Sequence, residues 1–288
     1  MTITLDDVRD HLEGFKSYGG YGMAICPFHD DHSPSMRVSD HGYKCMSCGA
    51  KGGLSFLYQT VSGRIVTRQK TYNRATKIWD DWMDRFGSIK SICSIAYTEL
   101  TRCQDLGDYL WKRGFTMDTV VAGKLGYLDG FYTFPVKDEY NEIQGLVVRA
   151  SPTIQTKDTR YSVSPNCPVK LYVPSWKSIR HATEIYVCFG TLDAWSLTVA
   201  GYPAVTGISG QELNWENLNR FNLPMWGIPD VNEEKSMFGL QRELGWRMKV
   251  LRLDYPDDCK DIQDVHRKYG LEKLKLLIEE KKKEQTYA

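Results

Sequence analysis

The sequence predicts an α/β protein: a small β-rich metal-binding module followed by a larger core in which a sheet is flanked by helices. Cysteine and histidine residues cluster between positions 26 and 48, as they do in small metal-bound modules. Residues 185–189 (IYVCF) form an apolar run without alternation, which is typical of a strand that is buried on both faces. The length of 288 residues, 42% of them hydrophobic, allows more than one domain.

The overall charge excludes a strong global attraction to nucleic acid, because the formal net charge is only +1. No stretch approaches the roughly 20 consecutive apolar residues that a membrane helix needs, so we expect a cytoplasmic protein without membrane contact. Positive charge is concentrated in one segment that contains no acid, which is more often a solvated helix face than a phosphate-binding one. Its members are Arg64, Arg68, Lys70, Arg74 and Lys77.

The strongest motif is a pair of metal half-sites. Cys26 and His29 form a C-x2-H pair, and Cys45 and Cys48 form a C-x2-C pair. A Cys3His set fills all four tetrahedral positions, which indicates one closed, structural Zn²⁺ site. His32 or His41 could be the fourth ligand instead of His29, but neither keeps the short spacing to Cys26. Another alternative is that the cysteines form a redox pair. The segments MRVS and GYK between the half-sites are predicted strands, and LSFLYQ after them a helix.

The segment CPFHDDHSPSMRVS…YKCMSCGAKGG resembles the Cys-His-Cys-Cys zinc ribbon that opens bacterial and bacteriophage DNA primases. The resemblance extends beyond the ligands to Pro27-Phe28, to the SPS sequence at 33–35 and to the glycines at 49, 52 and 53. It implies that the ribbon contacts single-stranded template. Arg37, Tyr43 and Lys44 are the candidate contacts, through charge and base stacking, although each of them equally suits a solvent-facing position.

The middle of the chain is expected to be helical from residue 61 to 105 and to connect the ribbon to the core. Trp79, Trp82, Met83 and Phe86 have i, i+3, i+4, i+7 spacing, which predicts a packing face. The segments FYTFPVKD and IQGLVVRA then predict a hairpin. Residues 106–180 resemble the first part of the primase polymerase core. Candidate phosphate or template contacts there, which would otherwise be ordinary loop cations, are Arg149, Lys157, Arg160 and Lys170.

Residues 181–265 resemble the toprim fold of primases and topoisomerases, a small sheet with helices on both sides. In that fold a strand ends in E-G-x-x-D; here Gly190 and Asp193 match, but Phe189 stands at the glutamate position. The resemblance implies nucleotidyl transfer with Mg²⁺, and the loss of the glutamate leaves that machinery incomplete. The candidate catalytic residues are Asp193, Asp230, Asn232 and Asp261.

The resemblance divides the chain into a zinc ribbon (1–60), a basic helical connector (61–105), the start of the polymerase core (106–180), a toprim-like domain (181–265) and a C-terminal amphipathic helix (266–288). That helix has Leu271, Leu274, Leu276 and Leu277 on or near its apolar face. The implied function is that of a phage-type DNA primase, which makes RNA primers on single-stranded DNA from ribonucleotides beside a replicative helicase. The alternative is a degenerate primase-like protein that binds DNA or a replication partner without synthesis.

Overall fold

The computed structural model describes residues 3–62, 74–155, 161–208 and 213–287. The chain separates into two compact units, Met1–Asn73 and Arg74–Ala288, and each is considered by itself. Both units combine helices with sheets, which confirms the predicted α/β class. Within the described residues, no helix is both long and apolar enough to cross a bilayer.

The smaller unit is a five-stranded antiparallel sheet with a short helix at each end of its sequence. The predicted strands MRVS and GYK and the predicted helix after them are all present. In chain order the elements are α1 (Leu5–Arg9), β1 (Lys16–Ser17), β2 (Tyr21–Ala24), β3 (Met36–Ser39), β4 (Gly42–Cys45), β5 (Lys51–Gly52) and α2 (Leu54–Ser62). Met36, Val38 and Leu57 are fully buried between the sheet and the helices.

The larger unit begins with helices that pack on an antiparallel sheet of order β6-β7-β8-β9. Trp79 and Trp82 are buried against Phe131 and Leu128, so the helices of the expected connector belong to this unit. Met83, predicted to pack with them, is instead 39% exposed. The elements are α3 (Arg74–Phe86), α4 (Ile89–Arg102), the 3-10 helix η1 (Gln104–Gly107), α5 (Asp108–Trp111), α6 (Met117–Gly123), β6 (Gly126–Leu128), β7 (Phe131–Lys137), β8 (Ile143–Ala150) and β9 (Tyr161–Val163).

A second sheet of order β10-β12-β11-β13-β14 follows, parallel except for β10. Its residues alternate between two cores: Ile185 and Val187 face one, Tyr186 and Cys188 the other, which confirms a strand buried on both faces. Its elements are β10 (Leu171–Tyr172), α7 (Trp176–Arg180), β11 (Ile185–Val187), α8 (Thr191–Val199), β12 (Ala204–Gly207), α9 (Trp215–Leu218), β13 (Met225–Gly227), α10 (Glu234–Leu244), the 3-10 helix η2 (Gly245–Arg247), β14 (Met248–Val250) and α11 (Ile262–Tyr287).

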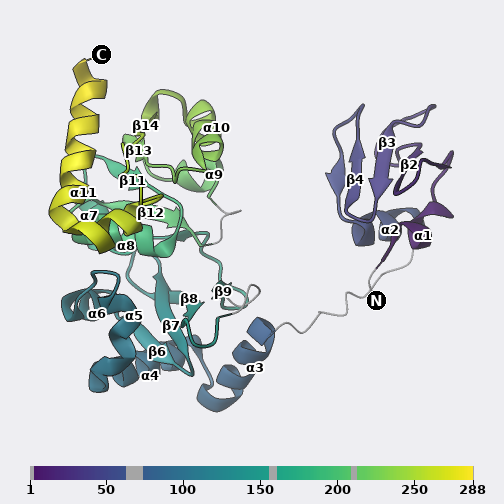
Figure 1. Cartoon of the computed structure of the whole chain (residues 1–288). Coiled ribbons are helices and arrows are strands. Elements are labelled where there is room, and N and C mark those ends of the chain that lie inside the picture. The colour runs from purple at the N-terminus through teal and green to yellow at the C-terminus, as the bar shows by residue number, and fades with distance from the viewer. Residues whose placement is uncertain (1–2, 63–73, 156–160, 209–212, 288) are drawn as a thin grey trace. The chain divides into compact units, whose positions relative to one another are not determined.

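Helices cover both faces of this sheet. Figure 1 shows α9 and α10 on one side of it and α8 and α11 on the other. The last helix starts at Ile262, earlier than predicted, and Gly270 interrupts it with a φ of 80°. Leu274 and Leu277 are buried on the sheet side, whereas Leu276 is 48% exposed. The finer boundaries at 106 and 181 stay predictions.

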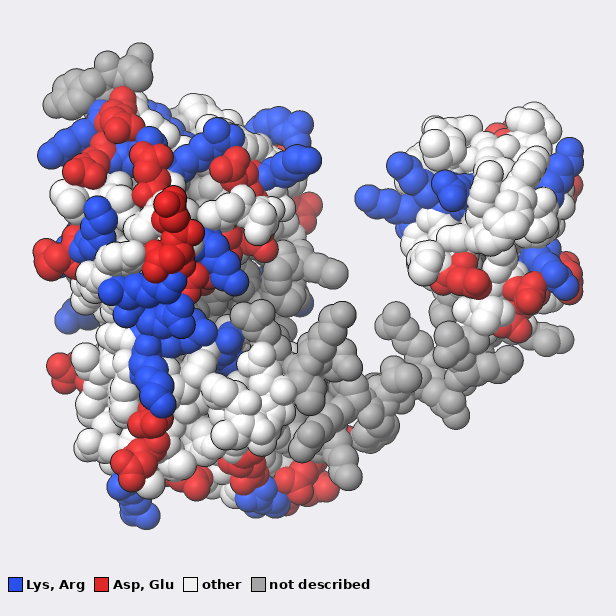
Figure 2. Space-filling view, in the orientation of Figure 1, with Lys and Arg blue, Asp and Glu red and all other residues white. Residues whose placement is uncertain are grey.

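Charge is gathered on parts of the surface although the net charge is small. In Figure 2, Lys and Arg form a band down the face of the larger unit on which α11 and α6 lie. The expected basic segment after residue 62 is mostly outside the described residues.

Candidate functional site

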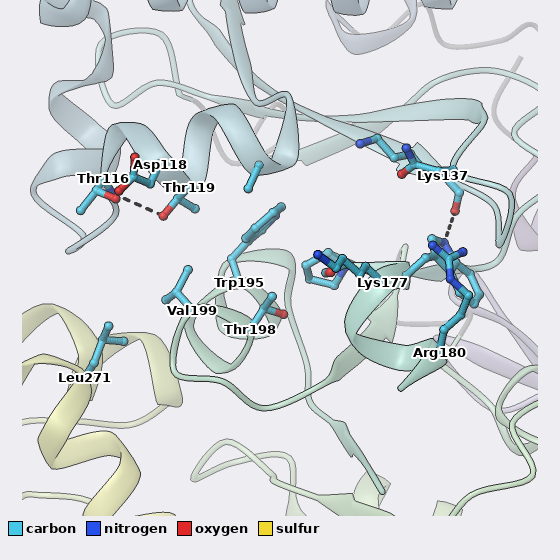
Figure 3. A pocket seen from close by; sticks show the side chains of 15 residues that line it. Thr116, Asp118, Thr119, Lys137, Lys177, Arg180, Trp195, Thr198, Val199 and Leu271 are labelled. Atoms are coloured by element: carbon cyan, nitrogen blue, oxygen red, sulfur yellow. Dashed lines mark hydrogen bonds between the residues drawn. The ribbon is translucent and has the colours of Figure 1, made fainter. Parts of the chain in front are cut away.

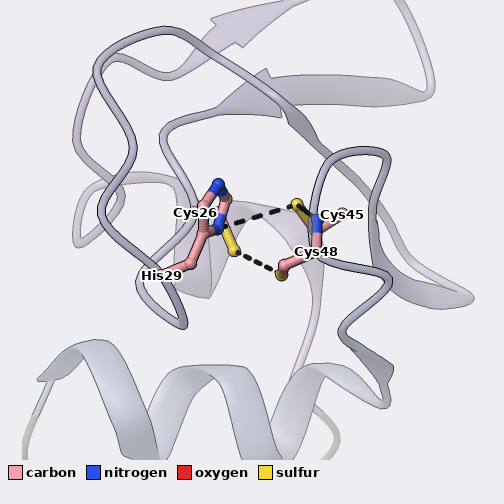
Figure 4. A group of neighbouring side chains, drawn as sticks. All are labelled: Cys26, His29, Cys45 and Cys48. Atoms are coloured by element: carbon pink, nitrogen blue, oxygen red, sulfur yellow. Dashed lines mark hydrogen bonds between the residues drawn. The ribbon is translucent and has the colours of Figure 1, made fainter.

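The four predicted metal ligands converge at the end of the ribbon sheet (Figure 4). Their ligand atoms all lie within 4.8 Å of one another, with Cys26 Sγ 3.8 Å from Cys48 Sγ and Cys45 Sγ 4.0 Å from His29 Nδ1. Sulfurs bound to one tetrahedral Zn²⁺ at about 2.3 Å lie about 3.8 Å apart, so the set fits one structural zinc. His32 is 88% exposed on its side chain and outside this group, which removes it as an alternative.

Asp31 and Ser35, which the sequence patterns did not identify as functional, support the metal ligands. Asp31 accepts hydrogen bonds from the Cys26 main-chain N–H at 2.8 Å and from Ser35 Oγ at 2.6 Å. Its other carboxylate oxygen lies 3.8 Å from His29 Nε2, on the far side of the ring from Nδ1, which is the usual place for an outer-sphere carboxylate. In the sequence, the only signal for this role of Asp31 is that an acid lies between the two half-sites. An acid there is also common in an ordinary loop.

The Cys45 sulfur lies in a ring of donors. Burial raises the pKa of the Cys45 thiol, but hydrogen bonds from Ser35 Oγ and from the main-chain N–H groups of Cys48 and Ser47 outweigh burial and lower that pKa to about 6. The thiolate is the form that binds a metal, so the loop geometry favours the ligand state.

One face of the ribbon sheet carries a row of cations. Cross-strand pairing aligns Lys16 with Met23, Met23 with Arg37, Arg37 with Lys44, and Lys44 with Lys51. The four basic side chains are exposed, and none has an acidic partner among the described residues. Like charges that face each other across strands are destabilising, so this cation row is suited to an anionic partner. Arg37 also lies over the ring of Tyr21, 4.2 Å from its centroid.

Tyr43 does not join this face. It is 6% exposed, stacks on Phe28 with ring centroids 5.2 Å apart, and belongs to the ribbon core. The prediction that Tyr43 stacks on template bases is therefore wrong, because the ring is buried in the ribbon core and stacked on Phe28. Aromatic surface beside the cation row comes instead from Tyr21 and from Tyr18, which stacks on it at 5.6 Å and is 54% exposed.

In the larger unit, a pocket of about 910 Å³ lies where the order of the parallel strands reverses. Strand β11 pairs with β12 on one side and with β13 on the other, and ligands bind in the crevice outside such a switch point. Asp193 comes from the first turn of α8, Asp230 follows β13, and Asp261 precedes α11. The structure thus brings these three predicted acids into one site, the acidic pocket.

The surroundings of the carboxylates in the acidic pocket disfavour their charged form. Burial, followed by the charges of Asp230 and Asp261, raises the pKa of Asp193 well above its ordinary value. Burial and the charges of Asp261 and Glu233 raise the pKa of Asp230 to about 8. Asp230 Oδ1 is buried without a hydrogen-bond partner among the described residues. An orphaned carboxylate oxygen among other acids is what a divalent cation would satisfy, so the residues fit one.

The residues around Asp230 differ from the prediction. Asn232 is exposed in a turn and does not line the acidic pocket, so its prediction as a ligand is wrong. Glu233, one residue further in the same exposed turn, does line it, and partial burial raises its pKa. Phe189 lines the pocket too and packs against the core of the sheet. Its phenyl ring offers no carboxylate at this position.

The predicted template contacts of the larger unit have mixed outcomes. Arg149 is 4% exposed and donates to Tyr161 Oη, with its guanidinium over the rings of Tyr109 and Tyr161. It therefore cannot reach a phosphate directly; it supports Tyr161, which lines the acidic pocket. Lys170 is exposed just before β10 and is outside that lining. Lys157 and Arg160 lie outside the described residues.

Known proteins similar to this chain point in one direction. Residues 3–74 match the family model described as the CHC2 zinc finger. The DNA primase of Staphylococcus epidermidis is 24% identical over 75% of this chain and 47% of its own length. That of Helicobacter pylori strain J99 is 26% identical over 44% of this chain and 24% of its own length. The chain thus spans less than half the length of either relative.

Solved structures share the fold. The zinc-binding and RNA polymerase domains of the Aquifex aeolicus primase align with 96% of this chain and 83% of theirs, at a TM-score of 0.54 and 18% identity. A DnaG primase catalytic domain bound to single-stranded DNA aligns with 71% of this chain and 80% of its own, at 0.53 and 14%. Together with the zinc finger match, these findings relate the chain to DnaG-type primases with an N-terminal zinc ribbon.

Proposed function

We propose that this protein is a DNA primase of the phage type, which joins ribonucleotides into short primers on single-stranded DNA. The acidic pocket is the proposed site of synthesis, in a toprim-like sheet, and the ribbon is the proposed template-binding element. A replicative helicase is the proposed partner that brings the template. The proposal of a single-stranded DNA template is supported by the similarity to primases, one of which was solved with single-stranded DNA bound.

The observation that carries the proposal is the convergence of carboxylates at the strand switch point. Asp193, Asp230, Glu233 and Asp261 line one pocket and raise one another's pKa or have it raised by burial. Such clustering of carboxylates is unfavourable for folding, and carboxylates with raised pKa values are typical of functional sites. Mg²⁺ held by these carboxylates would neutralise charge that develops in phosphoryl transfer.

The chain's own residues have distinct roles in this proposal. Asp230 offers the unpaired buried oxygen and is the main ligand, and Asp193 and Asp261 flank it. Arg242 is the one basic residue among the described residues that line the pocket, and it is the proposed counter-charge for an incoming triphosphate. Tyr161 forms part of the wall on the side of the other sheet.

The absence of a carboxylate at Phe189 is the reason to weigh a second function. Without it the protein could be a primase-like binding protein that holds DNA through the cation row and does not synthesise. Glu233 favours the active alternative, because it supplies a further carboxylate to the same pocket from the turn after Asp230.

Primer synthesis with labelled ribonucleotides on mixed-sequence single-stranded DNA tests the proposal. We expect products from the wild-type protein with Mg²⁺, none from Asp230→Asn, and wild-type yield from Asn232→Ala, the exposed neighbour outside the pocket. Absence of products from the wild-type protein, with helicase supplied and with DNA binding intact, would select the binding protein instead.

A further inference from the structure

A second pocket of about 700 Å³ lies in the larger unit, and no described residue lines both it and the acidic pocket. Its walls come from α6, the end of β7, α7, α8 and the middle of α11 (Figure 3). The volume is within the range of small-molecule sites, about 300–1,000 Å³. Trp195 and Val199 of α8 supply an apolar wall.

The charges around this second pocket do not balance. Lys137, Lys177 and Arg180 line it, and Asp118 is the one carboxylate among its described lining residues. None of the three basic side chains has an ion-pair partner in the described parts of the chain. We call this site the cationic pocket.

Two hydrogen bonds connect the segments that carry the basic groups. Trp176 Nε1 donates to the main-chain oxygen of Lys137 at 2.8 Å, and Arg180 Nη1 donates to that of Glu139 at 2.7 Å. These bonds join α7 to the end of β7 and the turn after it, so the two segments that carry Lys137, Lys177 and Arg180 are held together before any ligand arrives. Such preorganisation reduces the entropy lost on binding.

Lys137 is held in an unfavourable position for a free cation. Burial, followed by the positive charge of Lys124, lowers the pKa of Lys137. A bound anion would offset both effects, because it would replace lost hydration and oppose the charge of Lys124. The other two cations are exposed at the rim, where they can reach the outer oxygens of a ligand.

We propose that the cationic pocket binds a small phosphorylated molecule, with a di- or triphosphate group held between Lys137, Lys177 and Arg180. Arginine recognises phosphate in a bidentate manner and lysine acts as a point charge, so this mixture suits several phosphate oxygens at once. The site is additional to the proposed polymerase site: it lacks the cluster of acids and would bind its ligand without a metal.

Calorimetric titration of the full-length protein with inorganic pyrophosphate, in magnesium-free buffer without a chelator, tests this site. We expect saturable binding that weakens at least tenfold in the double variant Lys177→Ala/Arg180→Ala. Both residues are exposed, so folding should be retained, as circular dichroism can verify. Lys235→Ala, an exposed cation of α10 outside both pockets, should bind as the wild type does.

Three results would overturn the proposal. One is the absence of binding up to millimolar pyrophosphate. Another is equal affinity in the wild type and the double variant. The third is loss of binding in Arg242→Ala, which would assign pyrophosphate to the acidic pocket. If the double variant weakens binding of a DNA oligonucleotide and pyrophosphate does not bind, the surface is a DNA contact and the small-ligand proposal is wrong.

Discussion

Asp193 Oδ1 accepts a hydrogen bond from the main-chain N–H of Gln263 at 2.9 Å, across 70 positions of sequence. The bond joins the first turn of α8 to the start of α11. Gln263 is in turn tied to Arg113, whose main-chain oxygen accepts from Gln263 Nε2 at 2.9 Å. The position of a proposed catalytic carboxylate therefore depends on three separate segments of the larger unit.

The first prediction concerns Gly190, which precedes α8 with a φ of 115°. A Cβ there would lie 2.6 Å from Asp193 Oδ2, so Gly190→Ala combines backbone strain with a clash against the carboxylate. We expect a loss of about 1–3 kcal/mol in the free energy of unfolding. Gly239→Ala, inside α10 with no atom within 4 Å of the new Cβ, should gain about 0.5–1 kcal/mol. Urea denaturation measures the free energy of unfolding of both variants. Equal changes in the two variants would contradict the predicted strain at Gly190.

The second prediction concerns pH and Asp230, whose folded-state pKa of about 8 exceeds the value of about 4 for an unfolded chain. Between these values the folded protein keeps a proton that the unfolded chain has lost, so the free energy of unfolding falls as pH rises. Asp230→Asn should therefore stabilise by on the order of 2 kcal/mol at pH 7.5 and by little at pH 4.5.

Denaturation in magnesium-free buffer at both pH values measures this difference. Asp257→Asn, at an exposed position, is the matched control and should change stability equally at both. A stabilisation by Asp230→Asn that does not depend on pH would argue against the buried, proton-holding carboxylate.

The third prediction concerns zinc. Cys45→Ser removes one of four ligands from a unit with a small core, so the metal should be lost and the ribbon should unfold. Elemental analysis should give one zinc per chain for the wild type and for Cys103→Ser, an exposed thiol of the larger unit, and none for Cys45→Ser. The thermal transition of the larger unit should remain. Zinc retained by Cys45→Ser would refute the assigned ligand set.

The fourth prediction concerns the cation row. Each phosphate contact to single-stranded DNA contributes about 0.7 to the slope of log affinity against log salt. Arg37→Ala/Lys44→Ala should lower affinity and reduce that slope by roughly 1 to 1.5. Arg9→Ala, in the same unit but paired with Asp6 at 2.8 Å, should leave the slope unchanged. Fluorescence anisotropy at several salt concentrations measures both, and an unchanged slope in the double variant would exclude the row from binding.

How much of the molecule the sequence predicts depends on how local each signal is. The zinc ligands and the strands between them follow from short spacings, so both agree with the structure. Asp193 was predicted because it follows a buried strand, whereas Asp230 and Asp261 were predicted from the resemblance to the toprim fold, and all three line one pocket. Asn232 was wrong and Glu233 was missed, since a single turn decides which neighbouring side chain enters the pocket.

Burial by distant partners was beyond the sequence patterns. Tyr43 and Arg149 looked like surface contacts, but Phe28 covers the one and Tyr109 with Tyr161 enclose the other. The cationic pocket gave no signal, because Lys137 is 40 positions from Lys177 and each resembles an ordinary surface cation. These features depend on packing between elements, which periodicity alone does not encode.

Primer synthesis is expected to depend on the carboxylates of the acidic pocket, although Phe189 stands at a position where no carboxylate is available. The rates of labelled ribonucleotide incorporation by Glu233→Gln and by Glu234→Gln measure this dependence. These neighbours differ in place: Glu233 lines the pocket, whereas Glu234 pairs with Arg252 at 3.0 Å. We predict a loss of at least tenfold for Glu233→Gln, about 1.4 kcal/mol or more in the barrier, and near wild-type rates for Glu234→Gln. Wild-type rates for both variants would show that the carboxylate of Glu233 is not needed for synthesis.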